Sequence, residues 1–226
     1  EAIERQNATP AVFGFSPSVT PQPADWPPHV RVAGYWFPDE PAWTPPPALE
    51  AFLAAGPPPV YVGFGSMSNS DPAQTFAVVR AALRAAGQRG VIHTGWSGAD
   101  ADAAGGDEMF ALDHAPHAWL FPRMAAVVHH GGAGTNAAGL RAGKPTLIIP
   151  HLGDQPYWGR RVHDLAVGAK PVTHHKLTES VLTSRVRQIV SDAAIRARAE
   201  ALGARIRAED GIGVAVRLIE EWMRPV

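Results

Sequence analysis

The residues best suited to chemistry in this chain form the stretch HHGGAGT, from His129 to Thr135. Glycines in a tight turn let an anion approach the backbone closely, and the N–H groups that begin a helix point outward toward it. The positive end of the helix dipole adds to this attraction. His130 stands on the rim of the turn, where a ring N–H could donate to the same anion. The stretch therefore predicts a site for a phosphate group.

A strand and a helix are expected to position this turn. Ala125–His129 is a short apolar run, long enough for a buried parallel strand and too short for a helix. Thr135 and Asn136 are candidate N-caps for a helix over Ala137–Ala142, and Gly143 suits its C-terminal end. A strand that leads through a small-residue turn into a helix is a favourable geometry for binding anions.

From Pro57 onward, strands and helices alternate along the chain. Short apolar runs predict strands at Val60–Phe64, Gly90–Thr94, Met109–Leu112, Ala125–His129, Thr146–Ile149 and Ala169–Val172. Further helices are predicted over Pro72–Ala86, Ala118–Phe121, Gln155–Ala166, Val181–Ala208 and Val214–Met223. This alternation favours an α/β fold with a Rossmann-like parallel sheet that carries helices on both faces.

Ligands of open parallel sheets bind beyond the carboxyl ends of the strands. Polar, aromatic or small residues follow five of the predicted strands, so we expect them to line one crevice. They are Ser66, Trp96, His114 with Ala115 and His117, His130 with Gly132, Ala133, Gly134 and Thr135, and Asp154 with Gln155.

Composition excludes several classes of protein. The chain has 226 residues, a net charge of −1 and no cysteine, so disulfides, thiolate zinc sites and cysteine nucleophiles are excluded, and nothing favours nucleic acid as a partner. The ten histidines form no H-E-x-x-H or comparable spacing, so no metal is expected. No apolar run has the length of about 20 residues that a transmembrane helix needs. We therefore expect a soluble cytoplasmic protein.

Residues 1–58 differ in composition from the rest because they hold most of the prolines. Proline at this density opposes both helices and central strands, so the segment is predicted to be a linker with docking strands. Ala11–Phe15 and Val30–Phe37 are the candidates for those strands. Residues 59–226 are then predicted to form the ligand-binding domain.

Two other phosphate-binding motifs match the sequence less well. Gly132-x-Gly134-x-x-Ala137 fits the dinucleotide pattern, with Asp154 about 20 residues further on, but that acid follows a proline and a glycine instead of ending a strand. A P-loop over Gly139–Lys144 is one residue short and has a proline where the magnesium-binding hydroxyl should stand. An NAD-dependent oxidoreductase remains the alternative enzyme.

A third interpretation rests on a family resemblance. HHGGAGT, followed by RAGKPTLIIP and GDQPYWGRRV, resembles the donor signature of inverting glycosyltransferases with the GT-B fold, above all the bacterial antibiotic and sterol glucosyltransferase group. The resemblance implies that His130 and the amides of Gly132–Thr135 hold the diphosphate of a UDP- or TDP-hexose, with Ser66 assisting. It implies that Asp154 and Gln155 bind hydroxyls of the sugar, and that neither a metal nor a cofactor takes part.

Two positions depart from that family pattern. His114-Ala115-Pro116-His117 stands where plant relatives carry Trp-Ala-Pro-Gln, whose tryptophan stacks on the uracil base. A histidine can stack on a base too, though less strongly. Ala138 stands where many relatives have a glutamate for the ribose hydroxyls, which leaves the choice between uridine and thymidine open.

The resemblance also concerns the N-terminal part of the chain. Text similar to Glu1–Pro59 closes an N-terminal domain in the family and leads to the C-terminal one. The family's catalytic base is usually a histidine near the start of that domain, so we expect this chain to bind the donor without transferring sugar efficiently. The implied acceptor is a hydrophobic small molecule, such as a sterol or an antibiotic aglycone. A stand-alone nucleotide-sugar-binding module is the other alternative.

Overall fold

The computed structural model describes residues 9–38, 42–65, 72–94 and 108–224. The chain divides into two compact units, one formed by residues 1–39 and 204–226 and the other by residues 40–203. The division falls at a different place from the predicted boundary after residue 58, which stays a prediction. Among the described residues, no helix is both long enough and apolar enough to cross a bilayer.

The larger unit is built on a five-stranded parallel sheet. Its strands are β3 (Val60–Gly63), β4 (Gly90–His93), β5 (Met109–Leu112), β6 (Ala126–His129) and β7 (Thr146–Ile148). Their order across the sheet is β5-β4-β3-β6-β7, and every neighbouring pair is parallel. This is the doubly wound order of a Rossmann-like fold, so the predicted fold class is confirmed.

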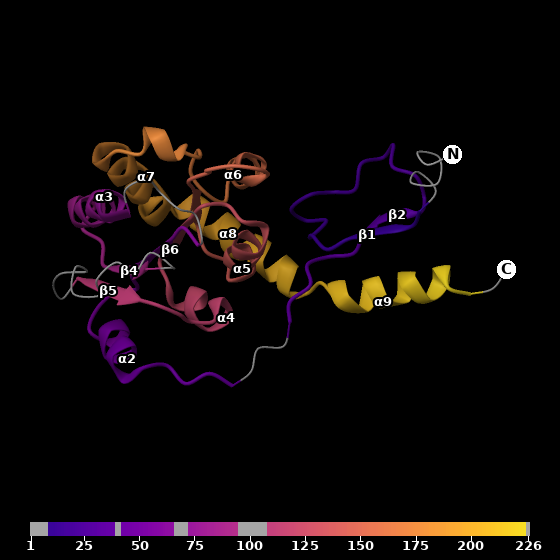
Figure 1. The fold of residues 1–226 in the computed structure, drawn as a ribbon, viewed down its shortest axis with the longest axis horizontal. Helices are drawn as coiled ribbons and strands as arrows, with labels where there is room; N and C mark the ends of the chain where they lie inside the picture. The colour runs from indigo at the N-terminus through magenta and orange to yellow at the C-terminus, as the bar shows by residue number, and fades with distance from the viewer. Residues whose placement is uncertain (1–8, 39–41, 66–71, 95–107, 225–226) are drawn as a thin grey trace. The chain divides into compact units, whose positions relative to one another are not determined.

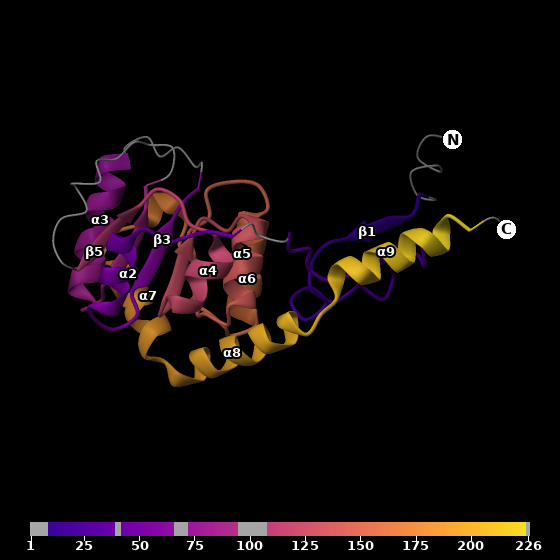
Figure 2. The ribbon, with the colours of Figure 1, turned by 90° about the horizontal axis from the view of Figure 1, so that it is seen from below.

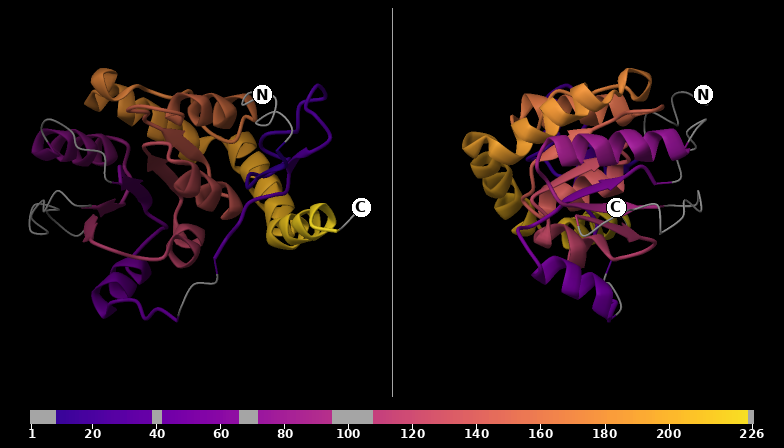
Figure 3. Two further views of the ribbon diagram at one scale, coloured as in Figure 1. Left: turned by 45° about the vertical axis from the view of Figure 1, so that its right-hand side comes forward. Right: turned by 90° about the vertical axis from the view of Figure 1, so that its left-hand side faces the viewer.

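Helices cover both faces of this sheet (Figures 1 and 2). α3 (Pro72–Ala85) and α7 (Glu179–Ser191) lie on one face, and α2 (Pro47–Ala54) and α4 (His117–Leu120) lie on the other. The right-hand view of Figure 3 shows the strands as a layer between them. Alternate strand residues serve the two cores because side chains alternate along a strand. Val60 and Val62 pack toward α3 and α7, whereas Tyr61 packs toward α2 and α4.

The remaining elements of this unit are α5 (Ala133–Arg141), α6 (Gln155–Asp164), the 3-10 turns η3 (Phe121–Arg123) and η4 (His174–Lys176), and α8 (Ala193–Arg207), whose end continues into the other unit. The single helix predicted over Val181–Ala208 is wrong, because Asp192 separates α7 from α8. Asp192 leaves the helical conformation with ψ 105°, and its Oδ1 accepts hydrogen bonds from the amides of Ala194 and Ile195.

Two further predictions near the sheet are wrong. Ala169–Val172 is not a strand, because it makes only single backbone hydrogen bonds to β7 after an isolated bridge from Thr146 to Gly168. The Pro171 nitrogen cannot donate to a ladder. The helix predicted to begin at Ala137 begins four residues earlier, at Ala133, with Gly132 as its N-cap in place of Thr135 or Asn136.

The segment predicted as a linker with docking strands, residues 1–58, also contains a helix that the sequence reasoning did not predict. Helix α2 lies inside that segment, because its prolines gather at the start of the helix, where no N–H is needed. The residues after Pro47 in α2 contain no further proline, and Leu49 is fully buried.

The smaller unit contains β1 (Ala11–Phe13), β2 (Val30–Val32) and α9 (Gly211–Trp222). β1 and β2 pair in parallel, so both docking strands are confirmed, although each is shorter than predicted. Ser16 donates a hydrogen bond of 2.6 Å to Glu209, which ties the N-terminal segment to the residues just before α9.

Candidate functional site

The direction in which the chain crosses the sheet reverses between β3 and β6. From β3 the next two strands extend to one side, and from β6 the following strand extends to the other. Gly63 at the end of β3 lies directly opposite His129 at the end of β6. The loops that leave these two strands therefore part from one another, and such a switch point is where open α/β sheets bind their ligands.

The His130 ring lies between two glycines at this switch point. A Cβ built on Gly65, which has a φ of 61°, would lie 3.0 Å from the Cε1 atom of His130. A Cβ on Gly132 would lie 2.5 Å from its Nε2 atom, closer than such contacts occur. Both positions therefore require glycine if the ring is to keep this place.

Burial lowers the pKa of His130, while the carbonyl of Gly63 and the carboxylate of Asp154 act in the opposite direction. The Nδ1 atom is buried and makes no hydrogen bond of good geometry to the described residues. A lowered pKa leaves the ring neutral at pH 7, with one N–H to donate. The Asp154 carboxylate therefore acts electrostatically on the His130 ring.

The turn after His130 presents the start of α5. Gly131 has a φ of 98°, and a Cβ there would lie 2.7 Å from the Ile148 side chain. Gly132 caps the helix without a side-chain hydrogen bond, so the first N–H groups of α5 have no partner in the helix itself. Ala133 and Gly134 are exposed, and a Cβ on Gly134 would meet no described atom within 4 Å. Exposed amides at a helix N-terminus are the kind of group that can bind an anion.

The predicted base-binding residues lie just before α4 and at its first position, since His114 and Ala115 precede the helix and His117 begins it. The His117 ring stacks on Phe121, with ring centroids 4.3 Å apart and planes 15° apart. Burial, followed by the neighbouring His93, His114 and His130, lowers the pKa of His117 to about 4. His114, which follows β5, and His130, which follows β6, therefore both act electrostatically on the His117 ring. His114 is exposed, and Ala115 is buried in the core.

Asp154 and Gln155 lie at the start of α6, after β7. The exposed Asp154 is the N-cap residue, and its Oδ2 accepts a hydrogen bond of 2.7 Å from the Nε1 of Trp158. Gln155 is buried, and its Oε1 accepts hydrogen bonds from the amides of His151 and Leu152 at 2.7 and 3.2 Å. The amide oxygen of Gln155 therefore holds the preceding turn, a role that the sequence did not indicate. Its predicted contact with a sugar stays a prediction.

Two predicted site residues, Ser66 and Trp96, lie outside the described residues. The structure adds His93, which the sequence reasoning missed. It ends β4 opposite Leu112 of β5, and burial lowers its pKa. It also lowers the pKa of His117, so it belongs to the same edge of the sheet. A histidine at the end of an apolar strand, as in His129, was the signal that could have identified it.

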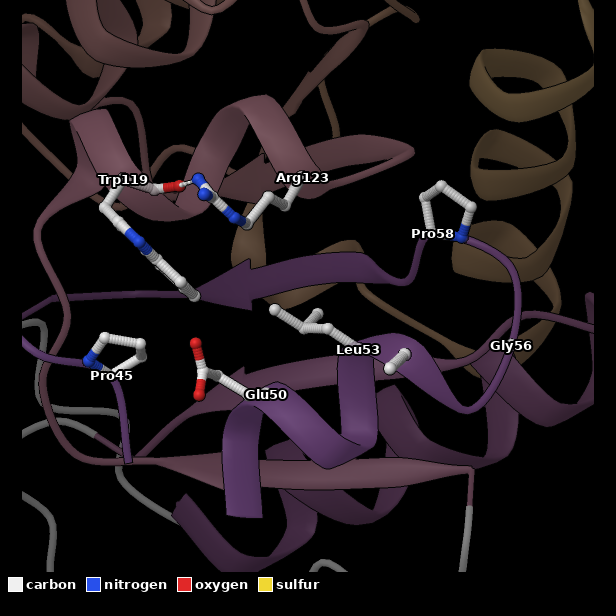
Figure 4. A pocket seen from close by; sticks show the side chains of 8 residues that line it. Pro45, Glu50, Leu53, Gly56, Pro58, Trp119 and Arg123 are labelled. Atoms are coloured by element: carbon white, nitrogen blue, oxygen red, sulfur yellow. Dashed lines mark hydrogen bonds between the residues drawn. The ribbon is translucent and has the colours of Figure 1, made fainter. Parts of the chain in front are cut away.

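A pocket with a volume of about 480 Å³ lies elsewhere in the same unit, between α2 and the segment from α4 to η3 (Figure 4). Arg123 lies over the Trp119 ring at 4.0 Å and donates to the Trp119 carbonyl, while Glu50 faces the same space. None of the residues that line it is a predicted site residue. They are Pro45, Glu50, Leu53, Ala54, Gly56, Pro58, Trp119 and Arg123.

Sequence comparisons identify related proteins. The model of the erythromycin biosynthesis protein CIII-like, C-terminal domain, matches residues 91–219. A sterol 3-beta-glucosyltransferase of Arabidopsis thaliana is 40% identical over 214 residues, which cover 92% of this chain and 33% of the relative. The O-mycaminosyltylonolide 6-deoxyallosyltransferase of Streptomyces fradiae is 42% identical over 216 residues, which cover 94% of this chain and 50% of the relative. The chain thus spans about a third to a half of these relatives.

Solved structures share the fold. The glycotransferase of kitacinnamycin aligns with 99% of this chain and 57% of its own, with a TM-score of 0.79 and 22% identity. The calicheamicin glycosyltransferase aligns with 94% of this chain and 53% of its own, with a TM-score of 0.72 and 20% identity. Such likeness shows a common GT-B architecture. Because the family model covers more than half of the sequence, the chain belongs to the family of the erythromycin biosynthesis protein CIII-like C-terminal domain.

Proposed function

We propose that this chain is the donor-binding part of an inverting glycosyltransferase that takes a UDP- or TDP-hexose and glycosylates a hydroxyl of a hydrophobic small molecule. The observation that carries the proposal is the position of His130. It stands at the switch point of the sheet, between Gly65 and Gly132, beside the open N-terminus of α5 and within electrostatic reach of Asp154. An anion that contacts the α5 amides would have the sugar-binding candidate Asp154 on the same rim.

The geometry supports a diphosphate more than a dinucleotide. In dinucleotide-binding folds the Gly-x-Gly-x-x-Gly turn follows the first strand of the sheet. Here Gly132-x-Gly134-x-x-Ala137 follows β6, which is the fourth of the five strands in chain order. A nicotinamide dinucleotide would therefore lack its usual phosphate turn.

The proposed reaction is a direct displacement. The acceptor oxygen bonds to the anomeric carbon as the bond from that carbon to the diphosphate oxygen breaks, and the electron pair leaves with the diphosphate. The acceptor proton passes to a base that we expect outside this chain. Negative charge grows on the leaving diphosphate, where the α5 amides, the helix dipole and the His130 N–H would stabilise it.

The names of the relatives suggest the partners. One relative is a sterol glucosyltransferase and another is a transferase named for the substrate O-mycaminosyltylonolide. Both names agree with a nucleotide-sugar donor and a hydrophobic acceptor. Within this proposal we expect the sugar to be glucose and the nucleoside to be uridine. Ala138 stands in place of a ribose-binding glutamate, so TDP should be tested beside UDP.

Calorimetric titration of the chain with UDP-glucose, TDP-glucose and NAD tests the proposal. We expect a sugar nucleotide to bind more tightly than NAD. We expect His130→Ala to weaken that binding by about 1.5–3 kcal/mol, the range for a hydrogen bond to a charged group. His163→Ala is the matched control, since His163 is an exposed histidine in the last turn of α6. Tighter binding of NAD, or equal binding by the two variants, would contradict the proposal.

A further inference from the structure

His129 is a fully buried histidine at the end of the central strand β6. A buried polar side chain costs free energy unless its groups are hydrogen-bonded, and an aliphatic residue would suit a central strand better. The strand positions before it are filled by Ala126, Val127 and Val128, all of them fully buried. The histidine therefore needs an explanation other than packing.

The ring of His129 accepts a hydrogen bond from the next turn. Its Nδ1 atom accepts from the amide of Gly131 at 3.0 Å, two residues along the chain. An accepting Nδ1 requires that the ring proton of the neutral imidazole sits on Nε2. Burial, followed by the nearby His130 and His117, lowers the pKa of His129 to about 3, so the ring stays neutral and Nδ1 stays an acceptor near pH 7.

The same turn is fixed from a second side. Gly131 has a φ of 98°, and the Ile148 side chain and the Gln155 residue lie so close that a Cβ there would be 2.7 Å from one and 3.2 Å from the other. The turn decides where the His130 ring and the first amides of α5 point. It is thus held by Ile148 and Gln155 on one side and by the His129 Nδ1 on the other.

We infer that His129 is a positioning residue, whose Nδ1 holds the Gly131 amide and thereby sets the His130 ring and the Gly132–Thr135 amides in the geometry that binds a diphosphate. The inference rests on the proposed function and extends it to a residue that does not itself touch the ligand. A turn that is ordered before binding spares the complex the free energy of ordering it.

Two substitutions of the same residue separate positioning from packing. His129→Leu removes the acceptor and keeps an apolar side chain. His129→Asn restores an acceptor, because its Oδ1 is as many bonds from the backbone as Nδ1. We expect the Kd for UDP to rise about 3- to 10-fold in H129L, which is the range of one net hydrogen bond. We expect the Kd of H129N to stay within about 2-fold of the unsubstituted chain, since its acceptor is restored.

A control variant and a second measurement distinguish the loss of positioning from a general loss of stability. Val128→Ala removes packing from the opposite side of β6 and should lower thermal stability without changing the Kd. Hydrogen exchange of the Gly131 amide, followed by NMR without ligand, should be slow in the unsubstituted chain and in H129N, and faster in H129L. If H129L does not fold, His129→Val takes its place with the same expectations, because a β-branched residue suits a central strand.

The outcomes test the positioning role of His129 and the proposed function separately. Wild-type affinity in H129L, or the same loss in H129N as in H129L, would overturn the positioning role while the proposed function stands. If the unsubstituted chain binds no nucleotide, the proposed function fails. The exchange rate of the Gly131 amide then still tests whether His129 holds the turn, and equal exchange in all three proteins would overturn that role as well.

Discussion

Imidazole rings at the carboxyl edge of the sheet are kept uncharged by burial. The pKa is lowered for His93, His117, His129, His130 and His151, and burial is the largest cause in every case. A neutral imidazole offers one N–H donor and avoids the cost of a buried charge in the absence of ligand. An anion beside such a ring favours the protonated form and raises the pKa of the ring. The anion would therefore bind more strongly to the protonated ring than to the neutral one.

His117 gives this arrangement a measurable pH dependence. Its pKa is about 4 in the folded chain and near the ordinary value of 6.5 in the unfolded chain, so the unfolded state takes up the proton first as the pH falls. The stability that the fold gains from keeping His117 neutral is present in full above about pH 6.5 and is lost as the pH falls toward 4. His117→Phe keeps the stack on Phe121 without titrating.

We expect the free energy of unfolding to fall less steeply in H117F than in the unsubstituted chain, by about 1–2 kcal/mol between pH 7.5 and pH 5. Urea denaturation at the two pH values measures it. His163→Phe is a control, since His163 is exposed on α6. Parallel pH profiles for the unsubstituted chain and H117F would contradict this assignment.

At the scale of elements, local sequence patterns predicted the five strands of the sheet correctly but not the segment that follows beside β7. Five apolar runs were enough to find β3, β4, β5, β6 and β7, because a strand buried on both faces is apolar throughout. The alternation with helices then predicted that the strands pair in parallel, as they do. Ala169–Val172 has the same apolar character, but Pro171 limits it to single hydrogen bonds with β7.

The start of α5 shows why the site itself was only partly predictable. Capping preferences pointed to Thr135 or Asn136, yet the helix begins at Ala133 after a glycine cap. The reason is tertiary, since the Gly131 turn is set by Ile148, Gln155 and the His129 ring. The carboxyl-edge rule predicted one site for His114, His117, His130 and Asp154, and electrostatic effects of His114 and His130 on His117 and of Asp154 on His130 agree with it, whereas the local role of Gln155 depends on a turn geometry that no spacing encodes.

Two glycines of α5 allow the proposed phosphate contact to be tested. Gly134 faces open space, and a Cβ on Gly139 would make an ordinary contact of 3.6 Å with Thr146. We expect Gly139→Ala to stabilise the fold by about 0.5–1 kcal/mol and to leave nucleotide binding unchanged, because alanine is the better helix former. We expect Gly134→Ala to be tolerated by the fold and to weaken binding of UDP, since its methyl group would occupy the space of the phosphate.

Thermal unfolding and calorimetric titration of the two variants measure both effects. The comparison is matched, because each variant adds one methyl group to the same helix. Undiminished affinity in G134A would mean that the ligand does not approach α5 at that position.

At the scale of the whole molecule, the predicted donor-binding residues that the structure describes all fall within residues 40–203, in one compact unit. We therefore expect donor binding to be a property of this unit, while the acceptor pocket and the catalytic base depend on other parts of a full-length protein. The relatives are two to three times as long as the segment they share with this chain, which leaves room for such parts.

A crystal structure of the chain with bound UDP tests the central claim most directly. The account predicts the diphosphate within hydrogen-bonding distance of the first amides of α5 and of the His130 ring, at the carboxyl ends of β3 and β6. A diphosphate bound away from this switch point, for example in the pocket between α2 and η3, would contradict it.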